Sequence, residues 1–324
     1  GRLWRDWGFA RAACARLAQE RFDLVQSHER LACCDVYRAG DGVHRVWLER
    51  RARAAGPLAC FAQSLSPYHR YVLAAERRMF ASPRLAAVIC NSRMVAREIA
   101  THFGLAQTKL HVIYNGVDLA RFHPGLRDEH RAAMRARLGV PDGAFTYVHV
   151  GSGFARKGVD RAIAALAALP DRDARLVVVG RDREEARMRR LAERVGVGGR
   201  VHFAGGQSDV RPWYALADAF VLATLYDPMP NAAVEALACG LPAVVTEQCG
   251  AAELVTPGAG GEVCDAFDPP SIVRAMAAAA QGDREARRQA ARASVEHLAL
   301  DAMGAALVAL YERLLAERAG GARV

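Results

Sequence analysis

Short apolar runs alternate with segments of helical spacing between residues 145 and 265. The apolar runs are rich in β-branched residues and are bounded by Gly, Asp or Pro, which predicts buried strands at Phe145–Val150, Leu176–Gly180, Val201–Ala204, Ala219–Ala223 and Ala243–Thr246. Helical spacing separates them at Val159–Leu169, Glu184–Val195, Val210–Leu216 and Ala232–Cys239. Strands that alternate with helices predict a doubly wound α/β domain with a parallel sheet.

The first part of the chain carries the same pattern less completely. Strands are expected at Leu24–Ser27, Ala87–Cys90 and around Lys109–Tyr114, with helices at Gly1–Glu20, near His44–Ala55, at Tyr68–Ala81 and at Arg93–Phe103. A complete doubly wound domain normally has more strands, so we expect one or two opening strands upstream of Gly1. Beyond Pro269 the pattern is helical throughout, over Ser271–Gln281, Arg284–Leu298 and Leu300–Ala319.

The length of 324 residues favours two domains. We expect an N-terminal domain over residues 1–125, a connection over 126–143, a C-terminal domain over 144–298, and a helix over 299–324 that returns to the first domain. No stretch approaches the roughly 18 charge-free apolar residues of a membrane-spanning helix, and no signal peptide is visible. The expected location is the cytoplasm, with peripheral contact at the inner face of the plasma membrane.

The eight cysteines show no C-x-x-C spacing, and the only close pair is Cys33–Cys34. We therefore expect reduced, structural thiols.

Basic residues are concentrated in the first part of the chain. Lys plus Arg number 23 against 12 Asp plus Glu over residues 1–140, and 21 against 23 over residues 141–324. An excess of this kind predicts an anionic partner for the first part, such as a phosphorylated glycan, lipid headgroups or nucleic acid. A basic face without any partner, from arginine-rich composition, is the alternative. Because no nucleic-acid-binding motif accompanies the charge, nucleic acid is not an expected partner.

The segment Gly151-Ser-Gly-Phe-Ala-Arg-Lys-Gly158 follows a predicted strand and opens a predicted helix. A glycine-rich turn at a helix start exposes backbone N–H groups to which a phosphate can bind. The chain has 44 Lys plus Arg, of which only Lys109 and Lys157 are lysines. A lysine retained at this turn suits a point contact to phosphate oxygens, although a solvated lysine at a helix start explains it too.

A second segment, Asp227-Pro-Met-Pro-Asn-Ala-Ala-Val-Glu235, lies between a predicted strand and the next helix. Open parallel sheets bind ligands in loops at the carboxyl ends of their strands. Glu235 falls in an otherwise apolar helix, where a carboxylate is costly unless it accepts hydrogen bonds. Sugar and ribose hydroxyls are suitable donors.

These two segments, in this order, make the chain resemble the family 4 retaining glycosyltransferases. Asp227 to Glu235 matches the family's E-x7-E motif, and Ala-Leu-Ala-Cys-Gly-Leu-Pro-Ala-Val-Val follows it. Asn91-Ser92, Val112-Ile-Tyr-Asn-Gly-Val-Asp118 and Phe122-His-Pro124 match the family's passage into the connection between domains. The resemblance implies the GT-B fold, with two Rossmann-like doubly wound domains that face each other across a cleft, the first of them incomplete here.

Within the family, Val148–Arg161 looks most like lipopolysaccharide core glucosyltransferases that add glucose to inner-core heptose. That resemblance implies that Arg156 and Lys157 bind the donor diphosphate, that Asp227 binds the transferred sugar, and that Glu235 binds the ribose. It adds Gly151, Ser152, Gly153, Asn231 and Ala232 to the donor-binding set, and implies UDP-glucose as donor, a retained anomeric configuration, no metal and no separate cofactor. The implied catalytic residues are His44, Arg156, Lys157 and Asp227.

Three departures from the family pattern stand out. Ser152 replaces the family's usual arginine after the first glycine, Asp227 replaces the first glutamate of the motif, and the glycine-rich loop that opens the family's first domain is absent. We expect Arg156 to supply the missing phosphate contact.

The acceptor is expected to be an anionic glycan or glycolipid, such as lipopolysaccharide core, with His28, Asp41, His44 and Arg45 as candidate contacts. Residues 43–80 combine arginines with Trp47 and Tyr71, which fits membrane contact as well as ordinary packing. Asp171-Arg-Asp173 imitates a D-x-D metal motif, but a solvated turn is the better interpretation. Two other functions remain open: an epimerase or phosphorylase on the same fold, and a protein that binds sugar nucleotide or glycan without turnover.

Overall fold

The computed structural model describes residues 1–56 and 65–321. The chain forms two compact units, the first made of Gly1–Asn115 with Asp301–Val324 and the second of Gly116–Leu300. Each unit is built on a parallel sheet wrapped by helices, so the expected α/β class is confirmed.

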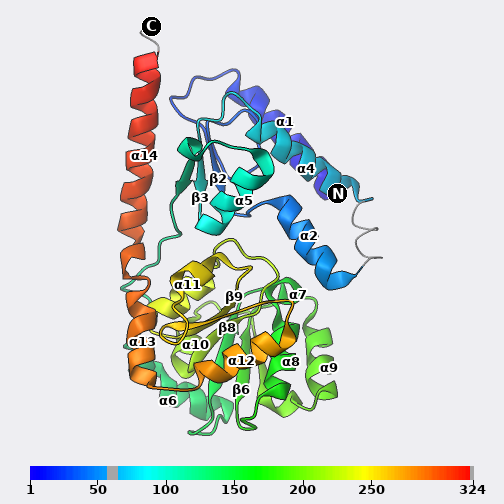
Figure 1. The fold of residues 1–324 in the computed structure, drawn as a ribbon, viewed down its shortest axis with the longest axis vertical. Coiled ribbons are helices and arrows are strands. Elements are labelled where there is room, and N and C mark those ends of the chain that lie inside the picture. The colour runs from blue at the N-terminus through cyan, green and yellow to red at the C-terminus, as the bar shows by residue number, and fades with distance from the viewer. Residues whose placement is uncertain (57–64, 322–324) are drawn as a thin grey trace. The chain divides into compact units, whose positions relative to one another are not determined.

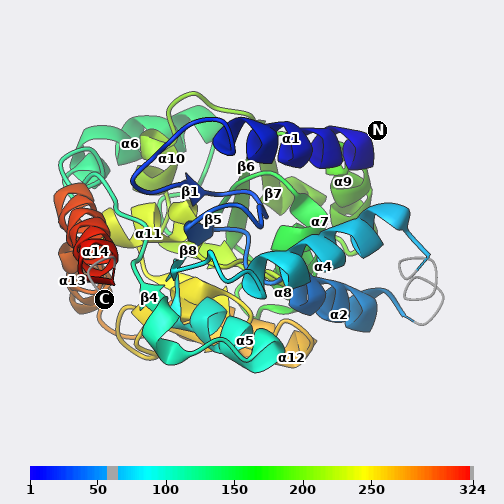
Figure 2. The same ribbon diagram turned by 90° about the horizontal axis from the view of Figure 1, so that it is seen from above.

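The first unit contains a sheet of four parallel strands in the order β1-β2-β3-β4. Its strands are β1 (Gln26–Ser27), β2 (Val36–Ala39), β3 (Ala87–Cys90) and β4 (Leu110–Val112), and its helices are α1 (Arg2–Leu17), α2 (His44–Ala55), α4 (Pro67–Phe80) and α5 (Arg93–Phe103), with a short 3-10 turn η1 (Gln107–Lys109) before β4. Figure 2 shows α2 and α4 packed side by side.

The sequence pattern did not predict β2, because Arg38 interrupts its short apolar run. The guanidinium of Arg38 donates to Asn115 Oδ1 at 3.0 Å, which satisfies the arginine within the sheet. The helix α5 begins and ends at conventional capping residues. Ser92 caps its start by accepting a hydrogen bond from the Val95 N–H at 3.2 Å, and Gly104 ends it in the left-handed backbone conformation.

A disulfide joins Cys14 at the end of α1 to Cys33 in the loop before β2. The expectation that all cysteines are reduced is therefore wrong for this pair. The two Cα atoms lie 5.7 Å apart although the residues are 19 apart in sequence, a proximity that spacing alone could not reveal. Five other cysteines are buried free thiols, Cys34, Cys90, Cys239, Cys249 and Cys264, and Cys60 lies outside the described residues.

The last helix, α14 (Leu300–Gly321), packs from Asp301 onward against the sheet of the first unit (Figure 1). Leu310 and Leu314 are buried against Val36, Ala87, Ile89 and Ile113. Burial of apolar side chains at helical spacing on a sheet face is the force that holds α14 there.

The second unit contains six parallel strands in the order β10-β9-β8-β5-β6-β7. They are β5 (Thr146–Val150), β6 (Arg175–Val179), β7 (Val201–Gly205), β8 (Ala219–Leu222), β9 (Ala243–Thr246) and β10 (Gly261–Cys264); the helices are α6 (Leu126–Leu138), α7 (Phe154–Lys157), α8 (Val159–Ala168), α9 (Glu185–Arg194), α10 (Arg211–Leu216), α11 (Asn231–Ala238), α12 (Pro269–Ala279) and α13 (Arg284–Ala293), with 3-10 turns η2 (Gly198–Arg200), η3 (Gly250–Leu254) and η4 (Glu296–Leu298). The sequence pattern missed only β10 among these strands.

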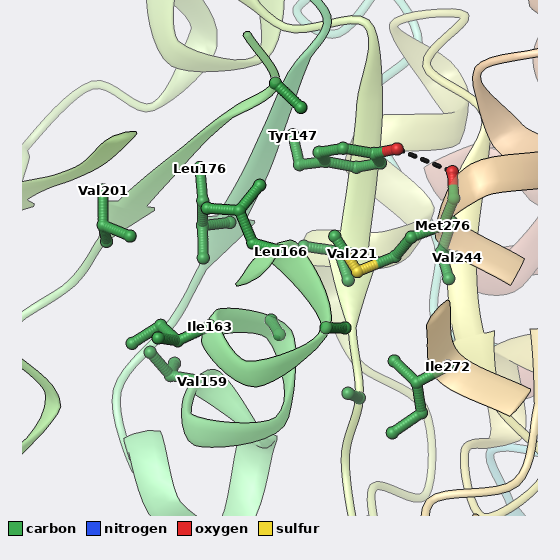
Figure 3. Packing of buried hydrophobic residues seen from close by; sticks show 14 of the residues in the cluster. Tyr147, Val159, Ile163, Leu166, Leu176, Val201, Val221, Val244, Ile272 and Met276 are labelled. Carbon is green, nitrogen blue, oxygen red and sulfur yellow. Dashed lines mark hydrogen bonds between the residues drawn. The ribbon is translucent and has the colours of Figure 1, made fainter. Parts of the chain in front are cut away.

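The core of the second unit lies between the sheet and helices α8, α9 and α12. Val159, Ala162, Ile163 and Leu166 recur at helical spacing on α8, and all four are buried. Figure 3 shows the α8 side chains Ile163 and Leu166 packed toward the strands. The Tyr147 hydroxyl, at the edge of this cluster, donates to the Met276 carbonyl at 2.6 Å (Figure 3). This rigid core supports the loops at the strand ends.

The segment 126–143, which we expected to connect two domains, carries the helix α6 of the second unit. Arg127, Arg131 and Arg135 recur every fourth residue on one face of α6. The carboxylate of Asp218, just before β8, pairs with these arginines at 3.3, 2.7 and 3.6 Å. The charged pattern of this segment therefore reflects a helix anchored by ion pairs.

Candidate functional site

The order of strands in the second unit reverses between β5 and β8, which are neighbours in the sheet but not in the chain. Ligands of open parallel sheets bind outside the carboxyl ends of the strands at such a reversal. Two loops leave the sheet there, one after β5 over residues 151–158 and one after β8 over residues 223–230. These loops hold the two sequence segments that predicted chemistry.

The two loops are bonded to each other. The Arg156 carbonyl accepts hydrogen bonds from the Leu225 N–H and from the Thr224 hydroxyl, both at 3.0 Å. Gly158 has φ +76°, and a Cβ atom there would lie 1.8 Å from the Ala223 carbonyl oxygen. Only glycine permits this approach, so the final glycine of the first loop is needed for the second loop to pack against it.

Arg156, Lys157 and Asp227 form one charged cluster at the mouth of the site. Arg156 Nη1 lies 3.2 Å from Asp227 Oδ2, and Lys157 Nζ lies 3.4 Å from the same oxygen. Arg156 Nη1 also donates to the Tyr226 carbonyl at 2.9 Å. The side chains of Lys157 and Asp227 are 14% and 10% exposed, whereas that of Arg156 is 38% exposed. Three of the predicted residues thus meet, and an anionic ligand has two cations to contact.

The side chain of Lys157 lies over Gly151. A Cβ atom at Gly151 would lie 3.0 Å from Lys157 Nζ, and the glycine has φ +140°. The small residue leaves room for the ammonium to reach Asp227. Ser152, which follows it, is exposed, and Gly153 is partly exposed.

Asp182, in the loop after β6, occupies part of the expected phosphate site. Its carboxylate accepts from the N–H groups of Gly153 and Phe154, at 2.6 and 3.1 Å, and from the Glu184 N–H at 2.8 Å. Burial alone would raise the pKa of Asp182, but these hydrogen bonds outweigh it and hold the pKa below the usual value. The expectation that these two N–H groups are open to a phosphate is wrong. Asp182 orders the loop, and the cations of Arg156 and Lys157 remain for an anion.

Glu235 lies on α11 beside a buried tyrosine. Its Oε2 accepts from the Tyr214 hydroxyl at 2.8 Å, and the same hydroxyl lies 3.2 Å from the Ala232 carbonyl. Burial raises the pKa of Glu235 above its usual value, although the Tyr214 hydrogen bond acts in the opposite direction. Asn231 is exposed at the start of α11, and Ala232 is partly exposed. The second predicted segment therefore brings Asp227, Asn231, Ala232 and Glu235 along one loop and helix.

In the first unit, His44 lies at the start of α2. Its Nε2 is 3.1 Å from His69 Nδ1, and its backbone N–H donates to Glu76 Oε1 at 2.9 Å. Burial, with Arg30 and His69 nearby, lowers the pKa of His44 to about 4, so its imidazole is neutral at pH 7. A neutral imidazole offers one donor and one acceptor nitrogen, and a sugar hydroxyl can pair with either.

The other candidate acceptor residues of the first unit are more exposed. Asp41 is 82% exposed and lies 3.9 Å from Arg30, which also pairs with Glu76 at 3.0 Å. Arg45 pairs with Glu49 at 3.7 Å on the outer face of α2, and exposed His28 lies 3.5 Å from Gln26. The structure thus links Asp41 to His44 through Arg30 and Glu76, but leaves His28 and Arg45 apart from them.

Residues 130–296, about half of the chain, match the family described as "Glycosyl transferases group 1". The chain belongs to this family. Residues 1–121 match a second family, "Glycosyltransferase Family 4", which covers most of the first unit. The resemblance predicted from the sequence motifs is therefore confirmed.

Two curated relatives and one solved structure illustrate the similarity to known glycosyltransferases. The chain is 28% identical over 250 residues to lipopolysaccharide glucosyltransferase WaaG of Escherichia coli K12, covering 76% of this chain and 65% of the relative. It is 35% identical over 145 residues to the lipopolysaccharide core biosynthesis glycosyltransferase LpsE of Rhizobium meliloti, covering 45% and 42%. A crystal structure of WaaG superposes with a TM-score of 0.72 at 25% identity, covering 93% of this chain and 79% of the other.

The chain thus spans 65% and 42% of the lengths of these two curated relatives. The match to WaaG supports the GT-B fold class for this group 1 glycosyl transferase chain.

Sequence reasoning missed several residues in and around the candidate site. Asp182 could have been found, because it follows β6, the strand next to β5, and carboxyl ends of parallel strands share one edge. Tyr214 and His149 carry no such signal. His149 is buried on β5, its Nδ1 lies 3.2 Å from the Val221 carbonyl, and its Nε2 has no hydrogen-bond partner among the described residues. Burial, with Lys157 nearby, lowers the pKa of His149 to about 3, so it is neutral.

The D-x-D segment of the sequence forms a turn at the surface. Asp171 and Asp173 form an exposed turn in which the Asp173 N–H donates to Asp171 Oδ1 at 2.8 Å. Within residues 1–56 and 65–321, His, Cys, Asp and Glu side chains nowhere gather in a group of three or more that could hold a metal ion. Over the same residues, no helix combines the length and apolar character that a membrane crossing requires.

Proposed function

We propose that this chain is the greater part of a retaining glycosyltransferase that moves glucose from UDP-glucose to a glycan or glycolipid acceptor such as lipopolysaccharide core. The observation that carries the proposal is the cluster of Arg156, Lys157 and Asp227 at the strand-order reversal. Two cations and a carboxylate suit the two ends of a sugar diphosphate. Lipopolysaccharide is named for both curated relatives described above, which supports the acceptor class.

The donor side of the proposal assigns a role to each residue. Cleavage of the bond between the anomeric carbon and the diphosphate leaves negative charge on the phosphate, which Arg156 and Lys157 stabilise. Asp227 accepts hydrogen bonds from hydroxyls of the transferred sugar, and Glu235 accepts them from the ribose. The charge of two side-chain cations makes a divalent ion unnecessary in this scheme, and no further cofactor is proposed.

We propose retention by front-face substitution. The bond from the anomeric carbon to the phosphate oxygen breaks, and the bond to the acceptor oxygen forms on the same face of the sugar. The acceptor hydroxyl proton passes to the departing phosphate oxygen, so no protein carboxylate has to attack the sugar as in a retaining glycosidase. The roles left to the protein are positioning and electrostatic stabilisation.

The acceptor side rests on the first unit. We propose that the neutral imidazole of His44 contacts the transferred sugar or the acceptor, with Asp41, His28 and Arg45 as further acceptor contacts. The basic excess of residues 1–140 supports an anionic acceptor. It also supports peripheral contact with the inner face of the plasma membrane through residues 43–80, of which 57–64 lie outside the described residues. Outside that segment, α1 exposes Trp4 and Trp7 at 70% and 42%, which adds a second aromatic surface for such contact.

The experiment that tests the proposal measures release of UDP from UDP-glucose with and without lipopolysaccharide core acceptor, in the chain and in Lys157→Ala. Acceptor-dependent release that the substitution abolishes supports the transferase. Turnover of the nucleotide sugar without acceptor would instead indicate the epimerase or phosphorylase. Binding of UDP-glucose without product, whatever the acceptor, would indicate a binding protein.

A further inference from the structure

A pocket of about 210 Å³ lies within the first unit, where α1 packs along α4 (Figure 1). We call it the α1–α4 pocket. Its polar wall is formed by Arg5, Asp6, Glu29, Arg30, Asp41 and Tyr68, and Tyr71 adds a second aromatic ring. The volume is below the roughly 300–1,000 Å³ of sites for drug-sized ligands, so the pocket suits a single small polar unit.

The charges of the pocket do not favour an anion. Its wall holds two guanidiniums, Arg5 and Arg30, against three carboxylates, Asp6, Glu29 and Asp41, a formal net charge of 2 − 3 = −1. Both guanidiniums are already paired. Arg5 Nε lies 2.9 Å from Asp6 Oδ1, and Arg30 Nε lies 3.0 Å from Glu76 Oε1. A phosphate would therefore meet carboxylates in excess on this wall.

An uncharged polyol fits the same groups. Carboxylates accept hydrogen bonds from hydroxyls, and such charge-assisted bonds are stronger than neutral ones. Tyr68 and Tyr71 come from successive turns of α4 and are both partly exposed at the pocket. Tyrosine combines an apolar ring with a polar hydroxyl, which matches a sugar with one C–H face and a rim of hydroxyls.

A buried carboxylate lies next to the pocket wall without being part of it. Glu76, which follows the pocket residue Ala75 on α4, is 1% exposed. Its Oε1 accepts from Arg30 and from the His44 N–H, but its Oε2 has no hydrogen-bond partner among the described residues. A buried oxygen without a partner costs free energy and needs an explanation. Glu76 also joins the pocket wall to His44, since one carboxylate oxygen binds both Arg30 and the start of α2.

We propose that the α1–α4 pocket binds an uncharged pyranose unit of the acceptor, held by Asp6 and Glu29 and stacked against Tyr71. The inference rests on the proposed function and deepens it. The sugar unit occupies the pocket beside His44, and the anionic groups of the acceptor bind elsewhere on the basic surface of the first unit. Specificity for the acceptor is thereby divided between a subsite for an uncharged sugar and a basic surface.

The test uses saturation-transfer NMR on the full chain with a panel of neutral methyl pyranosides (gluco, galacto, manno and manno-heptose forms) and with glucose 6-phosphate. We expect at least one neutral glycoside to bind, and the phosphate not to strengthen binding. Asp6→Asn and Tyr71→Ala should each weaken binding about tenfold or more, the effect of losing one bond to a charged group or one stacked ring. Arg70→Ala, an exposed residue of the same helix outside the pocket wall, should leave binding unchanged.

The failure of this inference can be told from failure of the proposed function. UDP affinity, measured by calorimetry on the same samples, depends on the proposed donor site of the second unit. It should be unchanged in Asp6→Asn and Tyr71→Ala. Binding of no neutral glycoside, or equal binding in wild type and both variants, would overturn the subsite even if UDP binds. Absence of UDP binding to the wild type would instead overturn the proposed donor site. Asp6 lies on the surface helix α1, so its variant tests the subsite even if Tyr71→Ala fails to fold.

Discussion

Lys157 Nζ lies 3.4 Å from Asp227 Oδ2, although the two residues come from loops after different strands. Arg156 contacts the same carboxylate oxygen at 3.2 Å. The Asp227 carboxylate partly neutralises the two cations, which would attract a diphosphate more strongly without it. Sugar recognition and phosphate recognition should therefore respond in opposite ways when Asp227 is neutralised.

We expect Asp227→Asn to reduce glucose transfer by about 100-fold, because hydrogen bonds from sugar hydroxyls to a charged acceptor are lost. Affinity for UDP itself should stay equal or rise, because Arg156 and Lys157 lose their internal counter-charge. A transfer assay with UDP-glucose measures the first effect, and calorimetry with UDP and with UDP-glucose measures the affinities. Asp209→Asn, which removes a carboxylate paired with Arg211 at the surface, should change neither affinity. A loss of UDP affinity in Asp227→Asn would contradict the assigned role.

Asp182→Ala should destabilise the segment after β5, residues 151–158. The variant removes the acceptor of the Gly153 and Phe154 N–H groups, so we expect a loss of about 0.5–2 kcal/mol in the free energy of unfolding and a fall in UDP affinity. Asp283→Ala is the matched control, because Asp283 caps α13 by accepting from the Glu285 and Ala286 N–H groups. It should lose similar stability and keep UDP affinity. Equal UDP affinity in both variants would show that Asp182 does not order the site.

The stabilising contribution of Asp182 should be lost in acid. Since the pKa of Asp182 in the folded chain is below its usual value of 3.8, its contribution is present above that value and is lost as the pH falls through the lowered pKa. Chemical denaturation at several acidic pH values should therefore show a gap between wild type and Asp182→Asn that narrows as the pH falls. A gap that widens in acid would be incompatible with a lowered pKa.

Nucleotide binding should depend on the protonation of Glu235. Burial raises its pKa, so Glu235 takes up a proton at a higher pH than an ordinary glutamate does and then loses the negative charge that strengthens hydrogen bonds from ribose. UDP affinity should thus fall toward acid, and Tyr214→Phe, which removes a bond to the carboxylate, should move that fall to higher pH. Calorimetry between about pH 5 and pH 8 measures it. In Glu235→Gln this pH dependence should disappear; its persistence there would assign it to another group.

Loss of the Cys14–Cys33 disulfide should destabilise the first unit. The bridge closes a loop of 19 residues, for which the chain-entropy estimate is about 3 kcal/mol. We expect Cys14→Ala to lower the free energy of unfolding by that order while UDP affinity stays unchanged. Thiol alkylation of the unfolded chain without reductant, followed by mass spectrometry, should leave only this pair unlabelled among the described cysteines. Labelling of Cys14 and Cys33 would show that they are reduced.

The sequence predicted the second unit well because its strands are uninterrupted apolar runs with helices of regular spacing between them. Among its strands only β10 was missed, since Gly261–Cys264 includes Glu262 in a run of four residues. In the first unit, β2 contains Arg38, and only the fold reveals that Asn115 satisfies its guanidinium. Local patterns thus predict elements whose burial is uniform and miss those whose polar residues find distant partners.

The same limit applies to the site. Motif spacing named Arg156, Lys157, Asp227 and Glu235, and the structure brings the first three together. It could not show that Asp182 already binds the Gly153 and Phe154 N–H groups, because that contact joins loops from different strands. Whether His44 and the donor-site residues act on one sugar stays a prediction.

Lys157 is the residue proposed to bind the phosphates of the nucleotide donor, and calorimetric titration of UDP measures that contact. Lys157→Ala should weaken UDP binding by about 10- to 100-fold, the effect of losing a charge-assisted hydrogen bond. The other lysine supplies the control, because Lys109 Nζ donates to the Leu85 carbonyl in the first unit and Lys109→Ala should keep UDP affinity. Equal affinity in wild type and Lys157→Ala, or no UDP binding by the wild type, would contradict the account.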